Sequence, residues 1–140
     1  MQHRDKVTIL KIVEEIDIGI ELLGTASLEQ FLANEMLKRA MGMTCINVGE
    51  LVKVITDDLR NKYKTFPWRA VAGMRDITAH RYQTLRMEDV YLTVHDEYPW
   101  LKKQLKAILE WVCKINCVKQ HRLFDTPLFL YGKKYSESCA

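Results

Sequence analysis

Two side chains suited to phosphate chemistry lie five residues apart in the segment Arg75-Asp76-Ile77-Thr78-Ala79-His80-Arg81-Tyr82. Arginine is a permanent cation whose planar set of N–H donors fits a phosphate group. Histidine can give or take a proton near neutral pH. Arg75 could therefore hold a phosphate while His80 moves a proton to or from a ribose 2′-OH or a leaving oxygen. In principle that pair is enough to cleave RNA without a metal.

The spacing of this pair places a condition on the chemistry. Five residues of a regular helix rotate by about 140°, at roughly 3.6 residues per turn, so Arg75 and His80 do not share one face of a straight helix. The pair works only if the helix frays or turns at Ala79-His80, or if a second copy of the chain approaches. Two other interpretations stay open. Arg75 could form a surface ion pair with Asp76 or Glu50, and His80 could cap the C-terminus of a helix.

The composition indicates one globular domain with long helices. The chain has 140 residues, 48% of them hydrophobic and 28% charged, which fits a single core. Only 6 Gly and 3 Pro interrupt it, and the net charge of +3 permits an anionic partner without requiring one. We find no membrane span or signal peptide and expect a cytoplasmic protein. No disulfide framework is expected from the four cysteines, which are Cys45, Cys113, Cys117 and Cys139.

The first half of the chain predicts two long helices with a short one between them. Apolar residues recur at helical spacing over Val7–Leu23, and Ser27 with Gln30 is typical of a capping box that starts a short helix. Asn34 can cap a long helix over Glu35–Tyr63. The core-facing positions of that long helix are expected at Leu37, Met41, Ile46, Val48, Leu51, Val52, Ile55 and Leu59.

Two features inside this long helix bear on the candidate site. Gly42 and Gly49 weaken a helix, so each is expected to mark close packing against a neighbour. Glu50 lies in an apolar stretch and is expected to be buried or half-buried. It could form a structural hydrogen bond to a neighbouring helix, or it could position Arg75.

The second half predicts a helix that carries Arg75 and then further helical stretches. Pro67 suits the first turn of a helix that stops near His80. Residues Met87–His95 begin another helical stretch. Pro99 either kinks this stretch or begins a new helix that continues to about Asn116. The residues expected to face the core here are Trp68, Val71, Met74, Ile77, Trp100, Leu101, Leu105, Ile108, Leu109 and Val112. We find no convincing strand, so the fold class is all-α.

The C-terminal part differs in character. We predict a helical domain over residues 1–117 and an extension over 118–140. Within the extension, the apolar segment Phe124–Tyr131 is expected to dock on the bundle or on a partner subunit, and Lys133–Ala140 to form a loose tail. Cys113, Cys117 and His121 lie four residues apart, but three ligands drifting around a helix are a weak metal signal, and no metal is expected.

Beyond the arginine–histidine pair, the sequence resembles the HEPN-domain toxins of the HepT type. Arg-x4-His-x-Tyr preceded by Ala72-Gly73-Met74 resembles their signature, and Phe66-Pro67-Trp68-Arg69 resembles the segment before it. Ile46-Asn47-Val48-Gly49-Glu50 and Tyr98-Pro99-Trp100-Leu101-Lys102 are similar to two further segments of that family. Together the resemblance covers roughly residues 5–117.

The resemblance implies a dimeric, HEPN-like up-and-down bundle of four to five helices and a metal-independent ribonuclease toxin that leaves a cyclic phosphate. It implies Arg75 and His80 as the catalytic pair, with Asp76, Tyr82 and Glu50 in support. Asp76 stands where the family often has asparagine, so whether it orients His80 stays open. The resemblance also implies a minimal nucleotidyltransferase antitoxin, MntA-like, that transfers AMP to Tyr82.

The sequence leaves a second function open and indicates how RNA could be attracted. The alternative is a non-catalytic HEPN dimer that binds a nucleotidyltransferase partner or a nucleotide. No cofactor, membrane or DNA partner is expected. Basic residues near the motif could be an ordinary solvated surface or could steer RNA by counterion release; they are Arg60, Lys62, Lys64, Arg69, Arg81 and Arg86.

Overall fold

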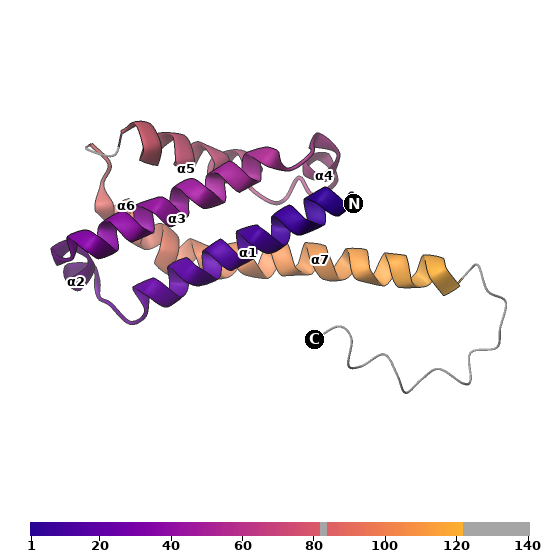
Figure 1. The fold of residues 1–140 in the computed structure, drawn as a ribbon, viewed down its shortest axis with the longest axis horizontal. Coiled ribbons are helices and arrows are strands. Elements are labelled where there is room, and N and C mark those ends of the chain that lie inside the picture. The colour runs from indigo at the N-terminus through magenta and orange to yellow at the C-terminus, as the bar shows by residue number, and fades with distance from the viewer. Residues whose placement is uncertain (82–83, 122–140) are drawn as a thin grey trace. The chain divides into compact units, whose positions relative to one another are not determined.

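The computed structural model describes the backbone of residues 1–81 and 84–121, with side chains as far as residue 110. The chain divides into two compact units, Met1–Glu110 and Trp111–Ala140. The described helices are α1 (His3–Leu23), α2 (Leu28–Ala33), α3 (Glu35–Val54), α4 (Asp57–Lys62), α5 (Trp68–His80), α6 (Met87–Leu92), the π-helix η1 (Thr93–Glu97) and α7 (Tyr98–His121) (Figure 1). The described residues contain no strand, and the prediction of an all-α fold is confirmed.

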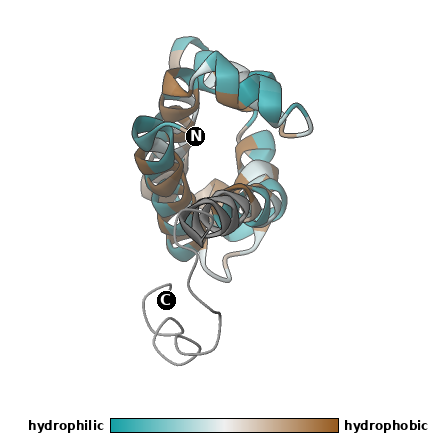
Figure 2. Ribbon diagram, turned by 90° about the vertical axis from the view of Figure 1, so that its right-hand side faces the viewer, coloured by the Kyte–Doolittle hydropathy of each residue, from teal (hydrophilic) through white to brown (hydrophobic). Residues whose placement is uncertain are grey.

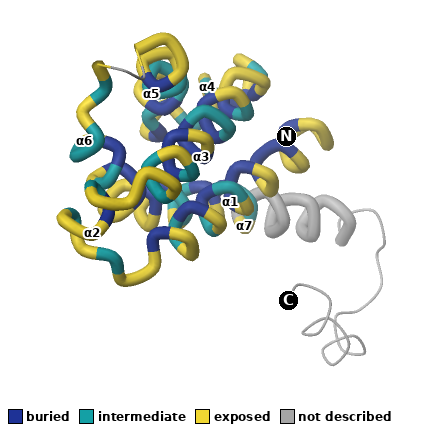
Figure 3. Tube along the Cα trace, turned by 60° about the vertical axis from the view of Figure 1, so that its left-hand side comes forward, coloured by how far each residue is buried: buried dark blue, intermediate teal, exposed yellow. Residues whose placement is uncertain are grey.

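Helix α3 lies between α1 and α5 in the first unit, and the three run side by side (Figure 1). Apolar residues recur every three or four positions on α1 and α3, so each helix buries one face (Figures 2 and 3). Burying each large aliphatic side chain contributes about 1.5–3 kcal/mol. The core includes Ile9, Ile12, Ile16, Met41, Cys45, Val48, Val52, Tyr98, Leu101 and Leu105.

The predicted helix over Glu35–Tyr63 is wrong at one point, because the chain breaks at Ile55-Thr56 and forms α3 and α4. The Thr56 hydroxyl accepts a hydrogen bond from the Leu59 N–H and caps α4. The buried carboxylate of Asp5, on α1, accepts hydrogen bonds from the Thr56 N–H and hydroxyl, at 3.1 and 2.8 Å. The apolar periodicity continues across this break, so periodicity alone could not reveal it.

Helix α5 packs unusually close to α3 at one glycine. A Cβ added to Gly49 would overlap with the Cβ of Arg75 and lie 3.2 Å from the Val71 carbonyl oxygen. Only glycine therefore allows the two backbones to approach this closely. The prediction that Gly49 marks close packing is confirmed, and the contact holds the base of the Arg75 side chain against α3.

The prediction that a new helix begins at Pro99 holds to within one residue, because α7 begins at Tyr98. The π-helix η1 directly precedes it, and the Tyr98 N–H donates to the Thr93 carbonyl, five residues earlier. A proline lacks an N–H, and its ring crowds the carbonyl four residues earlier in a regular α-helix. The wider π turn relieves that crowding. Around this turn α6 contacts α2 and α3, whereas η1 contacts α1.

Two residues predicted for the core are exposed instead. Ile77 is 51% exposed and Trp100 is 48% exposed. The next residue is buried in each case, namely Thr78 and Leu101. Thr78 can be buried because its hydroxyl donates to the Met74 carbonyl at 2.8 Å. In the part of the chain that the structure describes, no helix is both long and apolar enough to cross a bilayer.

Candidate active site

The end of α5 brings Arg75 and His80 together within one protomer. Arg75 Nη1 lies 3.4 Å from His80 Nε2. His80 is the last residue of α5, and Arg81 leaves helical geometry with φ −126° and ψ 28°. The helix therefore ends where the sequence predicted, and the long Arg75 side chain spans the angular difference without help from a second copy.

This contact restricts the protonation state of His80. A guanidinium group has only donors, so the hydrogen bond requires Nε2 to be an acceptor. The proton of the neutral ring then lies on Nδ1. A neutral imidazole on an exposed surface is the form that a general base needs, and Nε2 can take a proton once the Arg75 N–H turns away from it towards a ligand.

Two carboxylates hold the Arg75 guanidinium. Its Nε forms an ion pair with Glu50, and its Nη1 donates to Asp76 Oδ1 at 3.0 Å. The surface ion pairs that the sequence left open are therefore both present beside the histidine contact. Arg75 Nη2 makes no hydrogen bond to any described residue, so among these residues it is the donor of Arg75 without a partner.

Lys53 completes this cluster and was missed by sequence reasoning. Its Nζ lies 2.6 Å from Asp76 Oδ1 and 3.7 Å from Glu50 Oε1. The hydrogen bond from Lys53, followed by that from Arg75, holds the pKa of Asp76 below its ordinary value. One signal could have found Lys53: it follows Glu50 by three residues, which places both on one side of α3.

The remaining predicted site residues have different outcomes. Glu50 was expected to be buried or half-buried, and its side chain is 50% exposed. It contacts Arg75, as one of its two interpretations expected. Asp76 bonds to Lys53 and Arg75, and no described contact joins it to His80. Tyr82 lies outside the described residues.

One basic residue near the motif has a structural task. Arg60 Nη2 donates to the carbonyl oxygens of Val52 and Lys53, both at 3.0 Å, and so caps the end of α3. The other five basic residues predicted to steer RNA are exposed; they are Lys62, Lys64, Arg69, Arg81 and Arg86.

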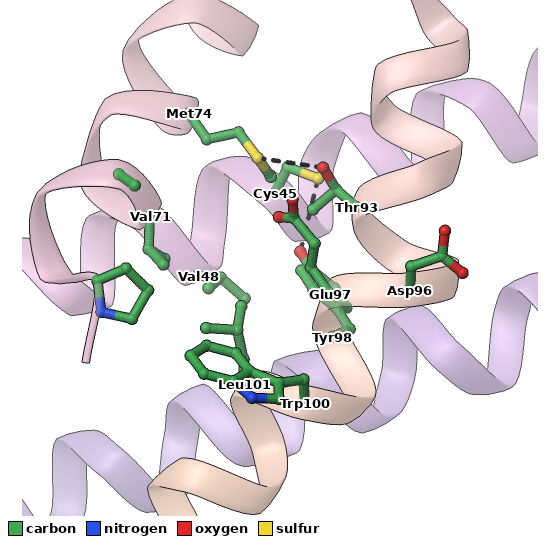
Figure 4. A pocket seen from close by; sticks show the side chains of 12 residues that line it. Cys45, Val48, Val71, Met74, Thr93, Asp96, Glu97, Tyr98, Trp100 and Leu101 are labelled. Carbon is green, nitrogen blue, oxygen red and sulfur yellow. Dashed lines mark hydrogen bonds between the residues drawn. The ribbon is translucent and has the colours of Figure 1, made fainter. Parts of the chain in front are cut away.

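A cavity of about 510 Å³ lies apart from this cluster, and Figure 4 shows its lining. Its walls are mostly apolar and include Val48, Val71 and Trp100, without Arg75 or His80. Cys45 and Tyr98 also line it, and the Tyr98 hydroxyl donates to Cys45 Sγ at 3.5 Å. Burial raises the pKa of the Cys45 thiol to about 11, so this thiol is not a nucleophile at neutral pH.

The described residues contain no group of three or more His, Cys, Asp or Glu side chains placed to hold a metal ion. The side chains of Cys113, Cys117 and His121 lie outside the described part of the structure.

The fold and the site together define an all-α protein with a partly buried arginine beside an exposed histidine at the end of a helix. The family model described as ribonuclease HepT-like matches residues 10–108, and the chain belongs to this family. No solved structure matches the chain.

Individual relatives are similar over most of their length. The protein of Caldanaerobacter subterraneus subsp. tengcongensis named "Putative RNase TTE0752" is 34% identical over 99 residues, which is 71% of this chain and 88% of that protein. The Methanocaldococcus jannaschii protein named "Putative RNase MJ1216" is 35% identical over 112 residues, covering 79% and 92%. The Thermococcus cleftensis protein named "Probable ribonuclease HepT" is 27% identical over 108 residues, covering 77% and 98%.

Proposed function

We propose that this chain is a metal-independent endoribonuclease in which Arg75 and His80 are the catalytic residues. The observation that carries the proposal is the contact of Arg75 with the exposed His80 at 3.4 Å, in which Arg75 Nη2 has no partner among the described residues. Family membership and the names of the relatives support RNA as the substrate.

In the proposed reaction, His80 Nε2 takes the proton of a ribose 2′-OH and O2′ attacks the adjacent phosphorus. Arg75 stabilises the negative charge that gathers on the phosphoryl oxygens, which is the usual role of a fixed cationic donor. The P–O5′ bond breaks, the 5′ oxygen takes up a proton from water, and His80 returns its proton to the solvent. The products are a 2′,3′-cyclic phosphate and a 5′-OH end.

The test is to incubate the purified chain with a labelled RNA in EDTA and to identify the new ends. Cleavage that persists in EDTA and leaves cyclic phosphate ends supports the proposal. Cleavage that needs an added divalent ion, or 3′-OH ends, contradicts it.

We also propose that the chain acts as a symmetric homodimer. Exposed apolar side chains follow the outer faces of α1 and α3, here called the α1–α3 face: Val7, Leu10, Ile18, Leu22, Met36, Met43 and Val54. The groove between these two helices includes Glu50 in its lining, so it reaches the residue that holds Arg75. A second copy on this face would cover apolar surface that isolated proteins rarely expose and would lie beside the site.

Equilibrium sedimentation at micromolar concentration is expected to give two chains per particle. Met43→Glu places a charge on the α1–α3 face and should shift the protein towards the monomer. Leu92→Glu is the matched control, because Leu92 is similarly exposed but lies on α6. A wild-type monomer that cuts RNA would rule out the dimer as a requirement.

A third part of the proposal concerns control of the activity by a toxin–antitoxin partner. We propose that a minimal nucleotidyltransferase of the MntA type transfers AMP to Tyr82. Tyr82 follows His80 by two residues, so an added AMP brings bulk and negative charge close to Arg75 and Arg81. Both effects oppose the entry of an RNA phosphate.

The switch is tested by incubating the protein with ATP, magnesium and the cognate nucleotidyltransferase and mapping adducts by mass spectrometry. Tyr82 is expected to gain AMP as cleavage falls, and Tyr82→Phe should resist inactivation. An adduct at another residue, or equal silencing of Tyr82→Phe, would show that the switch lies elsewhere.

A non-catalytic dimer that binds a nucleotidyltransferase or a nucleotide is the second candidate. The observation that favours it is the pairing of Arg75 with two carboxylates, which is typical of a structural arginine. This alternative expects intact RNA after incubation with the wild-type chain.

A further inference from the structure

Lys53 is the second cation of the site and touches both carboxylates that hold Arg75. Its Nζ donates to Asp76 Oδ1 at 2.6 Å, and the same oxygen accepts from Arg75 Nη1 at 3.0 Å. Its distance of 3.7 Å to Glu50 Oε1 closes a ring in which cations and carboxylates alternate. Nothing in the proposed reaction uses this lysine.

The charges of this ring sum to zero only with Lys53 included. Arg75 and Lys53 offset Glu50 and Asp76, and His80 is neutral while its Nε2 accepts a hydrogen bond. Without the lysine, two carboxylates face one guanidinium. The site would then carry a net negative charge where an RNA phosphate has to approach.

Lys53 also affects which donors of Arg75 stay free. A carboxylate and a guanidinium prefer a bidentate pair with two parallel hydrogen bonds. Asp76 makes one bond to Nη1, and its Oδ1 is shared with Lys53. A carboxylate released by Lys53 could turn to cover Nη2, the donor that has no described partner.

We propose that Lys53 is a positioning residue, which holds the Asp76 carboxylate towards α3 and so keeps Arg75 open to an RNA phosphate. This inference rests on the proposed function. It is consistent with the lowered pKa of Asp76, whose largest cause is the hydrogen bond from Lys53. Lys53 thus acts through Asp76 and has no direct role in bond cleavage.

The experiment measures RNA binding and cleavage in two backgrounds. Binding is measured with a 2′-O-methyl oligonucleotide, which lacks the attacking hydroxyl, and cleavage with the unmodified RNA. Lys53→Met is expected to weaken binding and raise KM by about tenfold or more, the scale of one charge-assisted hydrogen bond. The kcat should change less than KM. Lys53→Arg should restore most of the binding.

The decisive comparison adds Asp76→Asn. In that background the amide has no charge for Lys53 to offset, so Lys53→Met should change binding by less than about threefold. An equal loss in both backgrounds would mean that Lys53 acts on RNA directly, by contact or by its charge, rather than through Asp76, and the proposal would be wrong. Lys38→Met is the matched control: it removes a lysine from the same helix, where Lys38 pairs with Glu35, and should leave binding and cleavage unchanged.

A spectroscopic readout follows the same contact without any activity. The Asp76 carboxyl is titrated by carbon NMR, and its pKa should rise towards the ordinary value in Lys53→Met but not in Lys38→Met. An unchanged Asp76 pKa would overturn the inference. A wild-type chain that binds RNA and never cuts it contradicts the proposed function alone. If Lys53→Met weakens binding as much in the Asp76→Asn background as in the wild type, only the role of Lys53 is contradicted.

Discussion

Replacing His80 with alanine is expected to lower the rate of RNA cleavage by roughly 10²–10⁴-fold, the usual cost of removing a general acid or base. The His80 ring is exposed, so its truncation should leave the free energy of unfolding nearly unchanged. The measurement is the single-turnover rate with RNA in excess EDTA, together with the unfolding midpoint of each variant.

The control for this change is His95→Ala. His95 is also exposed and lies close to a carboxylate, with Nδ1 2.6 Å from Asp96 Oδ1, but it belongs to η1. Its loss should leave cleavage intact. If His80→Ala cuts RNA as fast as wild type, the catalytic assignment fails.

Arg75 variants separate catalysis from structure at the same site. Arg75→Lys keeps the charge but loses the fork that bonds Glu50, Asp76 and His80 at once, so cleavage should fall strongly. If Arg75 served only to pair with Glu50 and Asp76, lysine could still pair with a carboxylate and cleavage would change little. A full-activity Arg75→Lys variant would show that cleavage does not need the guanidinium fork of Arg75.

Gly49→Ala is expected to damage the fold and the site together. The new Cβ would overlap with Arg75 Cβ and press on the Val71 carbonyl oxygen. Neither atom can move away by a side-chain rotation, because the first is attached directly to the backbone and the second is part of it. Helix α5 must then move from α3 and carry Arg75 with it. We expect the free energy of unfolding to fall by about 1–3 kcal/mol, the usual cost of overpacking, and cleavage to fall at least about tenfold, since small displacements of positioning groups are costly.

Gly73→Ala is the matched control, because it makes the same change within a helix. A Cβ at Gly73 meets nothing within 4 Å. Alanine should stabilise α5 by about 0.5–1 kcal/mol relative to glycine. If Gly49→Ala is as stable and active as Gly73→Ala, the close approach of α3 and α5 does not determine the position of Arg75.

The parts of the fold that follow local rules were predictable. Helix α1 shows helical periodicity, and α2 has the predicted capping box between Ser27 and Gln30. The break at Ile55-Thr56 was not predictable, because Asp5, which holds it, is 51 residues away in the sequence. The exposure of Ile77 and Trp100 was missed for a related reason. The apolar character of a residue does not decide whether it or its neighbour in the sequence faces the core. That depends on how the helix is rotated about its axis against the helices it packs on.

The sequence predicted most residues of the candidate site but not the contacts between them. Glu50, Arg75, Asp76 and His80 were all named, and Gly49 was expected to be a close contact. The rotation of about 140° between Arg75 and His80 did not prevent their contact, because a long arginine side chain can reach a histidine on another face of its helix. Lys53 has an ordinary sequence context, and only the crossing of α3 and α5 brings it to Asp76.

The π turn at Thr93–Glu97 has a consequence for changes of chain length. It lies between α6, which contacts α2 and α3, and the first residues of α7, where Leu101 and Leu105 are buried. Each residue of a regular helix advances the side-chain direction by about 100°. Because this π turn holds one residue more than an α turn, deleting one residue from η1 would return the stretch to a regular α-helix and leave Leu101 and Leu105 facing the core. The same deletion within α6 would rotate them away by about 100°. The cost of shortening η1 would instead fall on Pro99, whose ring would again crowd the carbonyl four residues earlier.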